Sequence, residues 1–391
     1  MAYVVQYGLL PFAVLWYHRP MKTIGIVAEF NPFHEGHQYL IEQAKADTDA
    51  DICVVVMSGN FVQRGMPAAF DKWQRAQTAV EQGVNLVVEL PAVYAVNSAE
   101  YFAKGAIEVL EGLGAVDILA FGSESGDLES LKEAAGFLKD QDDALKERIQ
   151  VLMREGYSHP KAREIAVLEQ EHGFDDALIK EPNNILGIEY LKQIRNMVPH
   201  TVKRKGKGYH QSASEIRAQL ESACPSYFRS INDSYFKMTA MKILQMPVED
   251  LTSFAASDHG LANKLKKEIR YADSLESLIE RMKSKVYTRT RITRLLAHIL
   301  LGIGKADVEQ ARGYIRVLAF DAEGAKFLKH IKKQELNTLP VITNINKEAG
   351  NYPEILPTLE KDIQASDIYH LLTEENLYEM ADYTQRPYIH Q

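Results

Sequence analysis

Near its start the chain reads Ile24-Gly-Ile-Val-Ala-Glu-Phe-Asn-Pro-Phe-His34-Glu-Gly-His37, an apolar segment followed by two histidines around a glycine. The apolar residues predict a buried strand, and Pro32 ends it. A helix is expected over Gln38–Ala46, with Gly36 at the turn into it. The N-terminus of a helix carries unpaired N–H groups and the positive end of the helix dipole, so this turn is suited to bind a phosphate.

His34 and His37 are the candidate catalytic residues. Imidazoles on such a turn can donate hydrogen bonds to a phosphoryl group as its charge changes during in-line displacement. The pattern resembles the His-x-Gly-His signature of the nucleotidyltransferase superfamily, which includes class I aminoacyl-tRNA synthetases and the pantetheine-phosphate and nicotinamide-mononucleotide adenylyltransferases. Two other interpretations stay open: a zinc site made by the two histidines, and simple capping of a helix by surface histidines.

The composition favours two packed domains. The chain has 391 residues, of which 46% are hydrophobic, and this is enough for two cores. Its only cysteines, Cys53 and Cys224, form no C-x-x-C pair, which excludes a disulfide framework and a zinc-binding cysteine cluster and predicts a reducing, cytoplasmic location. The net charge of −8 means that any nucleic acid would bind a local basic patch.

Residues 1–20 are apolar, but they contain Pro11 and lack the basic start and cleavage site of a signal peptide. We expect them to be an upstream extension without a role, with the natural start at Met21. A weak membrane anchor is the alternative, and no other contact with a membrane is expected.

Strand and helix patterns alternate up to about residue 222. Further strands are expected over residues 52–57, 84–90, 117–121 and 201–204. Side-chain caps are expected to open helices at Asp71, at Asn97, at Asn183 or Asn184, and at Ser212. This order predicts a parallel sheet whose ligands bind at the carboxyl ends of the strands, with polar helices over residues 126–180 covering the sheet and the cleft.

The predicted fold class is therefore α/β. A Rossmann-like parallel-sheet nucleotidyltransferase domain is expected over residues 21–222. Helical periodicity dominates afterwards, so a mostly α-helical domain is expected over residues 223–391.

A second basic cluster follows the last expected strand of the first domain. Arg204 and Lys205 precede Ser212-Ala-Ser-Glu-Ile-Arg217, in which Ser212 and Glu215 form a capping box. Cations beside a serine-rich helix start suit a triphosphate or pyrophosphate, and the phosphate-binding candidates are Lys205, Ser212, Ser214 and Arg217. A solvated basic loop with an ordinary cap is the alternative. The motif looks like the Ser-x-Ser-x-x-Arg motif of the same superfamily, although Glu215 departs from its usual small or hydroxyl residue.

Five motifs occur together in the order Phe30-Asn-Pro-Phe-His-Glu-Gly-His37, Ser58-Gly-Asn-Phe-Val-Gln-Arg64, Leu86-Val-Val-Glu-Leu-Pro91, Phe121-Gly-Ser-Glu124 and Pro182-Asn-Asn-Ile-Leu-Gly187. In combination they resemble the bacterial tRNA(Met) cytidine acetate ligase family. The resemblance implies ATP-dependent acetylation of N4 of the wobble cytidine (position 34) of elongator tRNA(Met), which gives N4-acetylcytidine. Acetate is first activated as acetyl-adenylate with loss of pyrophosphate, and the cytidine amine then attacks the acetyl carbon.

The resemblance also implies which residues bind ATP. They are Val27, Ala28, Glu29, Phe30, Asn31, Pro32, Phe33, His34, Glu35, Gly36, His37, Gln38, Tyr39, Leu40, Gly122, Asn183 and Arg204. Mg²⁺ is expected to bridge the phosphates of ATP, and no metal held by the protein itself is predicted.

A basic stretch in the second half of the chain is the candidate tRNA-binding surface. Five cations and a tyrosine lie within the twelve residues from Lys283 to Arg294, a combination that suits contacts to an RNA backbone and base stacking. The tRNA-binding candidates are Lys283, Lys285, Arg289, Arg291 and Arg294. Lys329, Lys332 and Lys333 are candidates to extend the surface. A solvated helix face is the alternative.

Four further residues are candidates near the cleft: Gln63, Arg64, Lys72 and Arg75. For Lys72 and Arg75 an ordinary helix-surface position is the alternative. The alternative function for the whole chain is a small-molecule adenylyltransferase of the pantetheine-phosphate or nicotinamide-mononucleotide type, which would not need the basic second domain. An RNA-binding scaffold without activity conflicts with the presence of both phosphate motifs, and no protein partner is predicted.

Overall fold

The computed structural model describes residues 21–139, 143–205, 212–373 and 381–391. The predictions for residues 1–20, an extension or a weak membrane anchor, lie outside these ranges. Within them no helix combines the length and the apolar character that crossing a bilayer requires.

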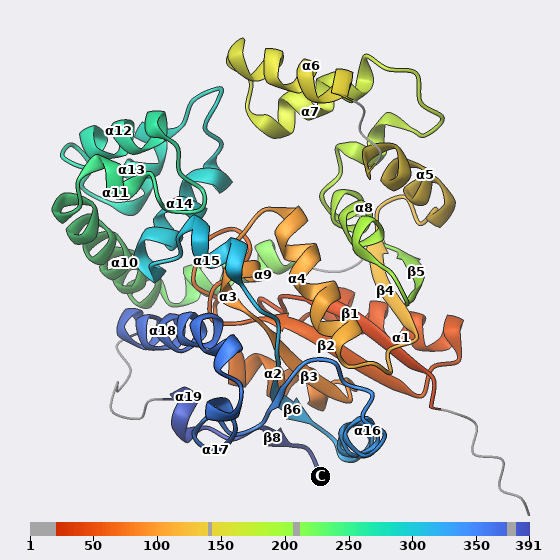
Figure 1. The fold of residues 1–391 in the computed structure, drawn as a ribbon. Coiled ribbons are helices and arrows are strands. Elements are labelled where there is room, and N and C mark those ends of the chain that lie inside the picture. The colour runs from red at the N-terminus through yellow and green to blue at the C-terminus, as the bar shows by residue number, and fades with distance from the viewer. Residues whose placement is uncertain (1–20, 140–142, 206–211, 374–380) are drawn as a thin grey trace, which may run out of the picture.

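The described residues form an eight-stranded sheet in the order β5-β4-β1-β2-β3-β6-β7, with β8 also beside β6 (Figure 1). Neighbouring strands among the first five are parallel, and helices connect them, which confirms the predicted Rossmann-like α/β architecture. These strands are β1 (Thr23–Ala28), β2 (Ile52–Ser58), β3 (Leu86–Leu90), β4 (Ile118–Ser123) and β5 (Val198–Lys203).

Both faces of the sheet are covered because the strands are apolar on both sides. In β2, Cys53, Val55 and Met57 belong to one hydrophobic cluster, whereas Val54 and Val56 belong to the other. The first cluster includes α1 (Glu35–Thr48) and α2 (Lys72–Glu81). The second includes α3 (Ala92–Ala95), α4 (Ala99–Gly112), α5 (Leu128–Lys139) and α8 (Pro182–Gln193).

The expected helices over residues 126–180 are present. They are α5, α6 (Asp143–Arg154), α7 (His159–Leu168) and a short 3-10 helix, η1 (Asp176–Ile179). In Figure 1 the pair α6 and α7 stands above the sheet, on the side of α8.

The second half of the chain is mostly helical, as predicted. Its helices are α9 (Ala213–Ala223), α10 (Pro225–Gln245), α11 (Val248–Leu251), α12 (His259–Glu268), α13 (Leu275–Met282), α14 (Arg289–Leu301), α15 (Lys305–Gln310), α16 (Ala322–Lys333), α17 (Ile345–Glu348), η2 (Ala349–Asn351), η3 (Pro353–Ile355), α18 (Leu356–Leu372) and α19 (Ala381–Thr384).

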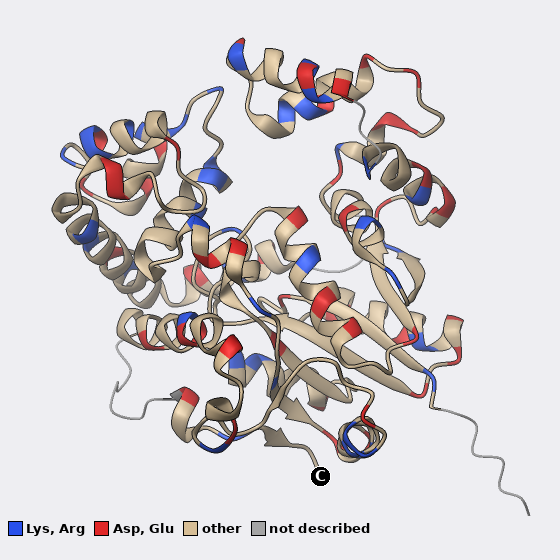
Figure 2. Cartoon of the chain, in the orientation of Figure 1, with Lys and Arg blue, Asp and Glu red and all other residues tan. Residues whose placement is uncertain are grey.

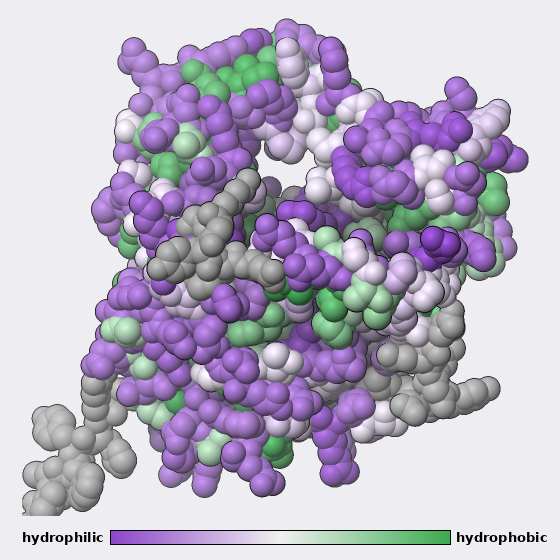
Figure 3. Space-filling model, turned by 180° about the vertical axis from the view of Figure 1, so that it is seen from behind, coloured by the Kyte–Doolittle hydropathy of each residue, from purple (hydrophilic) through white to green (hydrophobic). Residues whose placement is uncertain are grey.

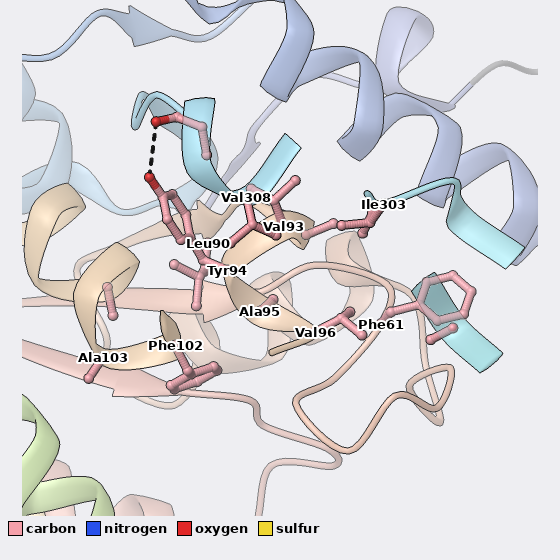
Figure 4. Close-up of a cluster of buried hydrophobic side chains, with 14 of the residues drawn as sticks. Phe61, Leu90, Val93, Tyr94, Ala95, Val96, Phe102, Ala103, Ile303 and Val308 are labelled. Atoms are coloured by element: carbon pink, nitrogen blue, oxygen red, sulfur yellow. Dashed lines mark hydrogen bonds between the residues drawn. The ribbon is translucent and has the colours of Figure 1, made fainter. Parts of the chain in front are cut away.

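Three strands of this half join the sheet, which the sequence did not predict. β6 (Ile315–Phe320) is antiparallel to β3 and covers its edge, and β7 (Val341–Ile342) and β8 (Tyr388–Ile389) lie along β6. A continuous core also crosses the expected boundary at residues 222/223. Figure 4 shows Val93 and Tyr94 of α3 packed near Ile303 and Val308, with the Tyr94 hydroxyl donating to the carbonyl of Ala311 at 3.3 Å. The two-domain division stays a prediction.

Two of the predicted side-chain caps are wrong. The cap at Asp71 is present, since its carboxylate accepts from the N–H of Gln74 at 2.8 Å. Helix α4, however, begins after Ser98, without a side-chain cap. Helix α8 begins after Glu181, so Asn183 and Asn184 lie in its first turn instead of capping it.

The N-terminus of α8 is satisfied from another part of the chain. The carboxylate of Glu124 accepts from the N–H groups of Asn183 and Asn184, at 3.3 and 2.9 Å. A charged acceptor beyond the helix therefore replaces the local cap that the sequence pattern indicated.

His298 of α14 makes the stability of the fold depend on pH. Its ring is buried, donates from Nε2 to the carbonyl of Val96 at 2.6 Å and accepts at Nδ1 from the N–H of Ala256 at 3.2 Å. Burial lowers the pKa of His298 from 6.5 to about 4. The unfolded chain then binds the proton first as the pH falls, so stability is lost below about 6.5 until the pH reaches about 4.

We therefore expect the free energy of unfolding to fall by about 2 kcal/mol from pH 7 to pH 5 because of His298. Urea denaturation at the two pH values measures this loss. His298→Gln can still donate to the Val96 carbonyl but does not titrate, so its stability should change less over the same range. An equal pH dependence in the two proteins would contradict the role assigned to this ring.

Candidate active site

The turn between β1 and α1 holds both predicted catalytic histidines. Helix α1 begins at Glu35, earlier than predicted, with His34 as its N-cap. The Nδ1 of His34 accepts from the N–H of Gly36 at 3.0 Å, and the Nδ1 of His37 accepts from the N–H of His34 at 3.3 Å. A Cβ on Gly36 would lie 2.9 Å from the His34 ring, so this reciprocal cap requires glycine. Capping, an alternative left open by the sequence, is thus part of the site geometry.

The cap determines which nitrogens of the two rings can act on a phosphate. Because both Nδ1 atoms accept hydrogen bonds, the neutral rings carry their protons on Nε2. The rings stack with centroids 3.8 Å apart, and Phe30 lies edge-on to His37 at 4.9 Å. Burial, together with His34 and Arg204, holds the pKa of His37 well below 6.5. His37 is therefore a neutral N–H donor at physiological pH.

The second phosphate motif lies against the first. The predicted capping box is confirmed: Ser212 accepts from the N–H of Glu215 at 3.2 Å, and the Glu215 carboxylate accepts from the N–H of Ser212 at 2.6 Å. One turn later, Arg217 donates from Nη1 to the backbone carbonyl of Asn31 and from Nη2 to the hydroxyl of Ser214 at 3.2 Å. The helix start of α9 is thereby attached to the turn that precedes His34.

Gly122, Asn183 and Arg204 also come together, at the carboxyl ends of β4 and β5. Arg204 donates to the side-chain oxygen of Asn183 at 3.3 Å. Arg204 also packs against Gly122, where an added Cβ would lie 3.4 Å from the Cγ of Arg204. Asn183 lines the cleft. Asn184 is instead fully buried, with its side-chain oxygen accepting from the N–H groups of Glu124 and Ser125. Glu124 organises this group by accepting from Asn183 and Asn184. It was not predicted as a site residue, although it ends the family motif Phe121-Gly-Ser-Glu124 directly after a strand.

These elements surround one cleft of about 1710 Å³. Typical small-molecule sites occupy roughly 300–1,000 Å³, so this cleft has room for a nucleotide and a second substrate. Figure 3 shows an opening between the lobe that carries α6 and α7 and the lobe that carries α12 to α14. The predicted residues that line the cleft are Val27, Ala28, Glu29, Phe30, Asn31, His34, Gly36, His37, Tyr39, Leu40, Gln63, Arg64, Gly122, Asn183, Arg204, Lys205, Ser212, Ser214, Arg217 and Arg294. Pro32, Phe33, Glu35 and Gln38 are not among the lining residues.

The chain matches the family model described as HIGH Nucleotidyl Transferase over residues 21–384. Proteins named tRNA(Met) cytidine acetate ligase are 37% identical in Thermoanaerobacter sp. strain X514 (90% of this chain, 95% of that protein) and 34% identical in Clostridium novyi (94% and 99%). The chain belongs to the tRNA(Met) cytidine acetate ligase family. The crystal structure of Thermotoga maritima TmcAL bound with alpha-thio ATP superposes with a TM-score of 0.84 at 28% identity, covering 94% of this chain and 99% of that one.

A metal site at the two histidines finds no support in the geometry of this member of the ligase family. Both Nδ1 atoms already accept backbone hydrogen bonds. Within the described ranges, no three His, Cys, Asp or Glu side chains converge as metal ligands.

The predicted tRNA-binding cations do not form one uniform surface. Lys283 pairs with Glu280 at 3.0 Å, Arg289 with Glu276, and Arg291 with Asp258. Lys285 is exposed and makes no ion pair among the described residues. Figure 2 shows acidic residues interspersed with the basic ones on this helical lobe. Arg294 lies apart from them in the cleft, where its Nε donates to the carbonyl of Gln63 at 2.8 Å.

Several other basic candidates either are buried inside the protein or lie on a distant helix. Lys72 is fully buried, and its ammonium lies 2.9 Å from Glu89 and 2.8 Å from Asp382. Arg75 is buried as well and donates to the backbone carbonyls of Glu29, Ser58 and Gly59. The helix-surface alternative is wrong for this pair. Neither residue lines the cleft, although Arg75 contacts Glu29, which does line it. Lys329, Lys332 and Lys333 lie on α16, well away from α14 in Figure 1, so they do not extend its surface.

The tautomers predict opposite effects for two substitutions of His37. In His37→Asn the side-chain oxygen can replace Nδ1 as the cap acceptor, but no donor remains at Nε2. We expect formation of acetyl-adenylate, measured as acetate-dependent exchange of labelled pyrophosphate into ATP, to fall by about 10²-fold or more with little change in Tm. His37→Gln, which retains a donor near Nε2 but loses the cap, should be less stable and keep more activity.

His34→Asn should behave like His37→Asn, because the Nε2 of His34 is left as a donor by the same arrangement. Acetyl-adenylate synthesis at the normal rate in either Asn variant would contradict the assignment of the two rings to phosphoryl chemistry.

Proposed function

We propose that this protein is an ATP-dependent ligase that acetylates N4 of the wobble cytidine (position 34) of elongator tRNA(Met). The observation that carries the proposal is the contact of Arg217 with the Asn31 carbonyl, which joins the two phosphate motifs at one cleft. The relatives that match nearly the whole chain are named for this reaction.

The first step activates acetate. An acetate oxygen attacks the α-phosphorus of ATP, a new phosphorus–oxygen bond forms, and pyrophosphate leaves with the electron pair of the broken bond. The Nε2–H groups of His34 and His37 donate to the phosphoryl oxygens, on which negative charge is redistributed in the transition state. Arg204, Lys205 and the N-terminus of α9 hold the departing pyrophosphate.

Charge neutralisation in this step has two sources. The basic residues of the cleft, Arg204 and Lys205 among them, supply one, and Mg²⁺ bound with ATP would supply the other by offsetting part of the phosphate charge. Mg²⁺ would enter with ATP, because this ion is usually bound by substrate phosphates and waters with only one or two protein ligands.

The second step uses the tRNA. N4 of cytidine attacks the acetyl carbon, the nitrogen–carbon bond forms, and AMP leaves with the electron pair of its bond to the acetyl group while N4 loses a proton. The volume of the cleft and its opening between two lobes support access for a nucleotide of an RNA loop. We place the reaction in the cytoplasm, where tRNA and reduced cysteines are found together.

The test is incubation of the protein with ATP, labelled acetate and bulk tRNA, followed by mass spectrometry of the nucleosides. We expect N4-acetylcytidine in elongator tRNA(Met), with one AMP and one pyrophosphate released for each acetyl group. A small-molecule adenylyltransferase would release pyrophosphate with phosphopantetheine or nicotinamide mononucleotide, without acetate or tRNA. That result would overturn the proposal.

The ion pairs predict unequal contributions to tRNA binding. Lys285→Ala should weaken binding and reduce the slope of log affinity against log salt by about 0.7–0.9, because one phosphate contact is lost. Arg289→Ala should have a smaller effect, since Glu276 already offsets its charge. The triple variant of Lys285, Arg289 and Arg291 to Ala should still form acetyl-adenylate without tRNA.

Lys329→Ala on the distant α16 is the matched control for the lysine variant, and it should bind tRNA normally. If the triple variant kept the wild-type tRNA affinity and salt slope, the Lys283–Arg294 stretch would not be part of the tRNA-binding surface. Loss of adenylate formation would mean that the stretch is needed for the ATP site or the fold.

A further inference from the structure

The order of the strands divides the cleft into two sides. Gly122, Asn183 and Arg204, which we assign to ATP, lie at the ends of β4 and β5, on one side of β1. β2 and β3 lie on the other side of β1. Gln63 and Arg64, from the loop after β2, also line the cleft together with Arg294 of α14, and none of these three is among the residues that we assign to ATP.

The backbone of the loop at Gln63 is firmly held. The N–H of Gln63 donates to the carboxylate of Glu29 at 2.7 Å, and its carbonyl accepts from Arg294 at 2.8 Å. The next carbonyl, that of Arg64, accepts from the hydroxyl of Thr293 at 2.5 Å. Gly65 follows with φ +75°, and a Cβ there would lie 2.5 Å from the backbone of α14. The position of this loop in the cleft is thus fixed by main-chain contacts.

The side chain of Gln63 takes no part in that structure. Its Nε2 is shielded from solvent and has no hydrogen-bond partner among the described residues. A buried donor without a partner is unfavourable, so a ligand that accepts from it is favoured. Gln63 lines the cleft, so a change of its side-chain rotamer would bring this donor to a ligand bound there. Glu29, an acceptor, stands beside it. The family resemblance counts Glu29 among the ATP-binding residues, but its carboxylate is assigned here to the acceptor base instead.

The cleft here is also cationic. Arg64 is exposed at the cleft, and Arg294 reaches in from α14. Burial lowers the pKa of Arg294 to about 10, with Glu29 opposing and Arg64 adding to the effect, so the guanidinium stays charged at physiological pH. Guanidinium groups beside a donor and an acceptor at the base of a cleft match a nucleotide, whose phosphates are anionic and whose base edge has both kinds of group.

We infer that Gln63 and Glu29 read the Watson–Crick edge of the acceptor cytosine, while Arg64 and Arg294 bind the phosphates that flank it. The Nε2 of Gln63 donates to N3, and the carboxylate of Glu29 accepts from the N4 amino group. Uracil has a donor at N3 and an acceptor at O4, so it mismatches both contacts. The inference rests on the proposed function, since it names the part of the same cleft that selects the base.

The test compares two transcripts of elongator tRNA(Met), one with cytidine and one with uridine at the acceptor position, bound to the full-length protein. Wild type should prefer cytidine. Gln63→Leu should weaken binding of the cytidine transcript by about tenfold and leave the uridine transcript nearly unchanged, because only a contact to N3 of cytosine is lost. Gln63→Glu should reduce the preference further, since a carboxylate repels N3 of cytosine and can accept from N3–H of uracil.

Two controls separate base reading from structure. Arg64→Ala should weaken the binding of both transcripts equally. It should also lower the slope of log affinity against log salt by about 0.7–0.9, as expected for a phosphate contact. Gln63→Leu should leave the Tm unchanged, and it should form acetyl-adenylate normally in the absence of tRNA. Both are expected because the structural contacts of residue 63 are made by its backbone.

The inference would be overturned if Gln63→Leu kept the wild-type preference for cytidine, or if it lost the same amount of affinity for both transcripts. A parallel loss of acetyl-adenylate formation would also overturn it, because that loss would place Gln63 on the ATP side. Failure of the proposed function is a different result: wild type would then acetylate neither bulk tRNA nor the cytidine transcript.

Discussion

The reciprocal hydrogen bonds at the start of α1 are the constraint on which the proposed catalytic site depends. They occupy the Nδ1 atoms of His34 and His37, so both rings present Nε2–H as the donor. They also explain why residue 36 is a glycine, because any side chain at this position would collide with the ring of His34. The rest of the cleft is built against this turn. Arg217 of α9 holds the backbone carbonyl of Asn31, and the side chain of Asn31 accepts from the N–H of Ala69 at 2.8 Å.

The loop between β2 and α2 connects the turn between β1 and α1, which holds the two histidines, with the C-terminal helices. Hydroxyl groups from three of these helices donate to its carbonyls: Tyr235 to Gly65, Thr293 to Arg64, and Tyr369 to Ala68. The same loop donates an N–H to Glu29 beside the histidines. One set of hydrogen bonds therefore links the helical lobe to Glu29, which precedes the histidine turn. This arrangement suits an enzyme that must align an activated acetyl group with a nucleotide of a large RNA.

Charged residues near the site also hold the sheet together. Burial alone would lower the pKa of Lys72, but the carboxylates of Asp382 and Glu89 outweigh it and raise the pKa. The lysine thus stays charged between a strand of the first half and a helix near the C-terminus. Removing one partner of such a buried group is strongly destabilising, because the remaining charges are left uncompensated. Arg75 has a related role, since it braces the ends of β1 and β2 through their carbonyls.

The sequence by itself determined the parallel α/β sheet, the histidine turn, the capping box at Ser212 and the family, because each depends on periodicity or on residues close together in the chain. It could not determine that Glu124 satisfies the N-terminus of α8, that β6 closes the edge of β3, or that Lys72 is buried with Asp382, 310 residues away. Local patterns indicate that a helix end, a strand edge or a charge needs a partner. Only the tertiary structure decides which distant residue supplies it, since that choice depends on packing between segments far apart in sequence.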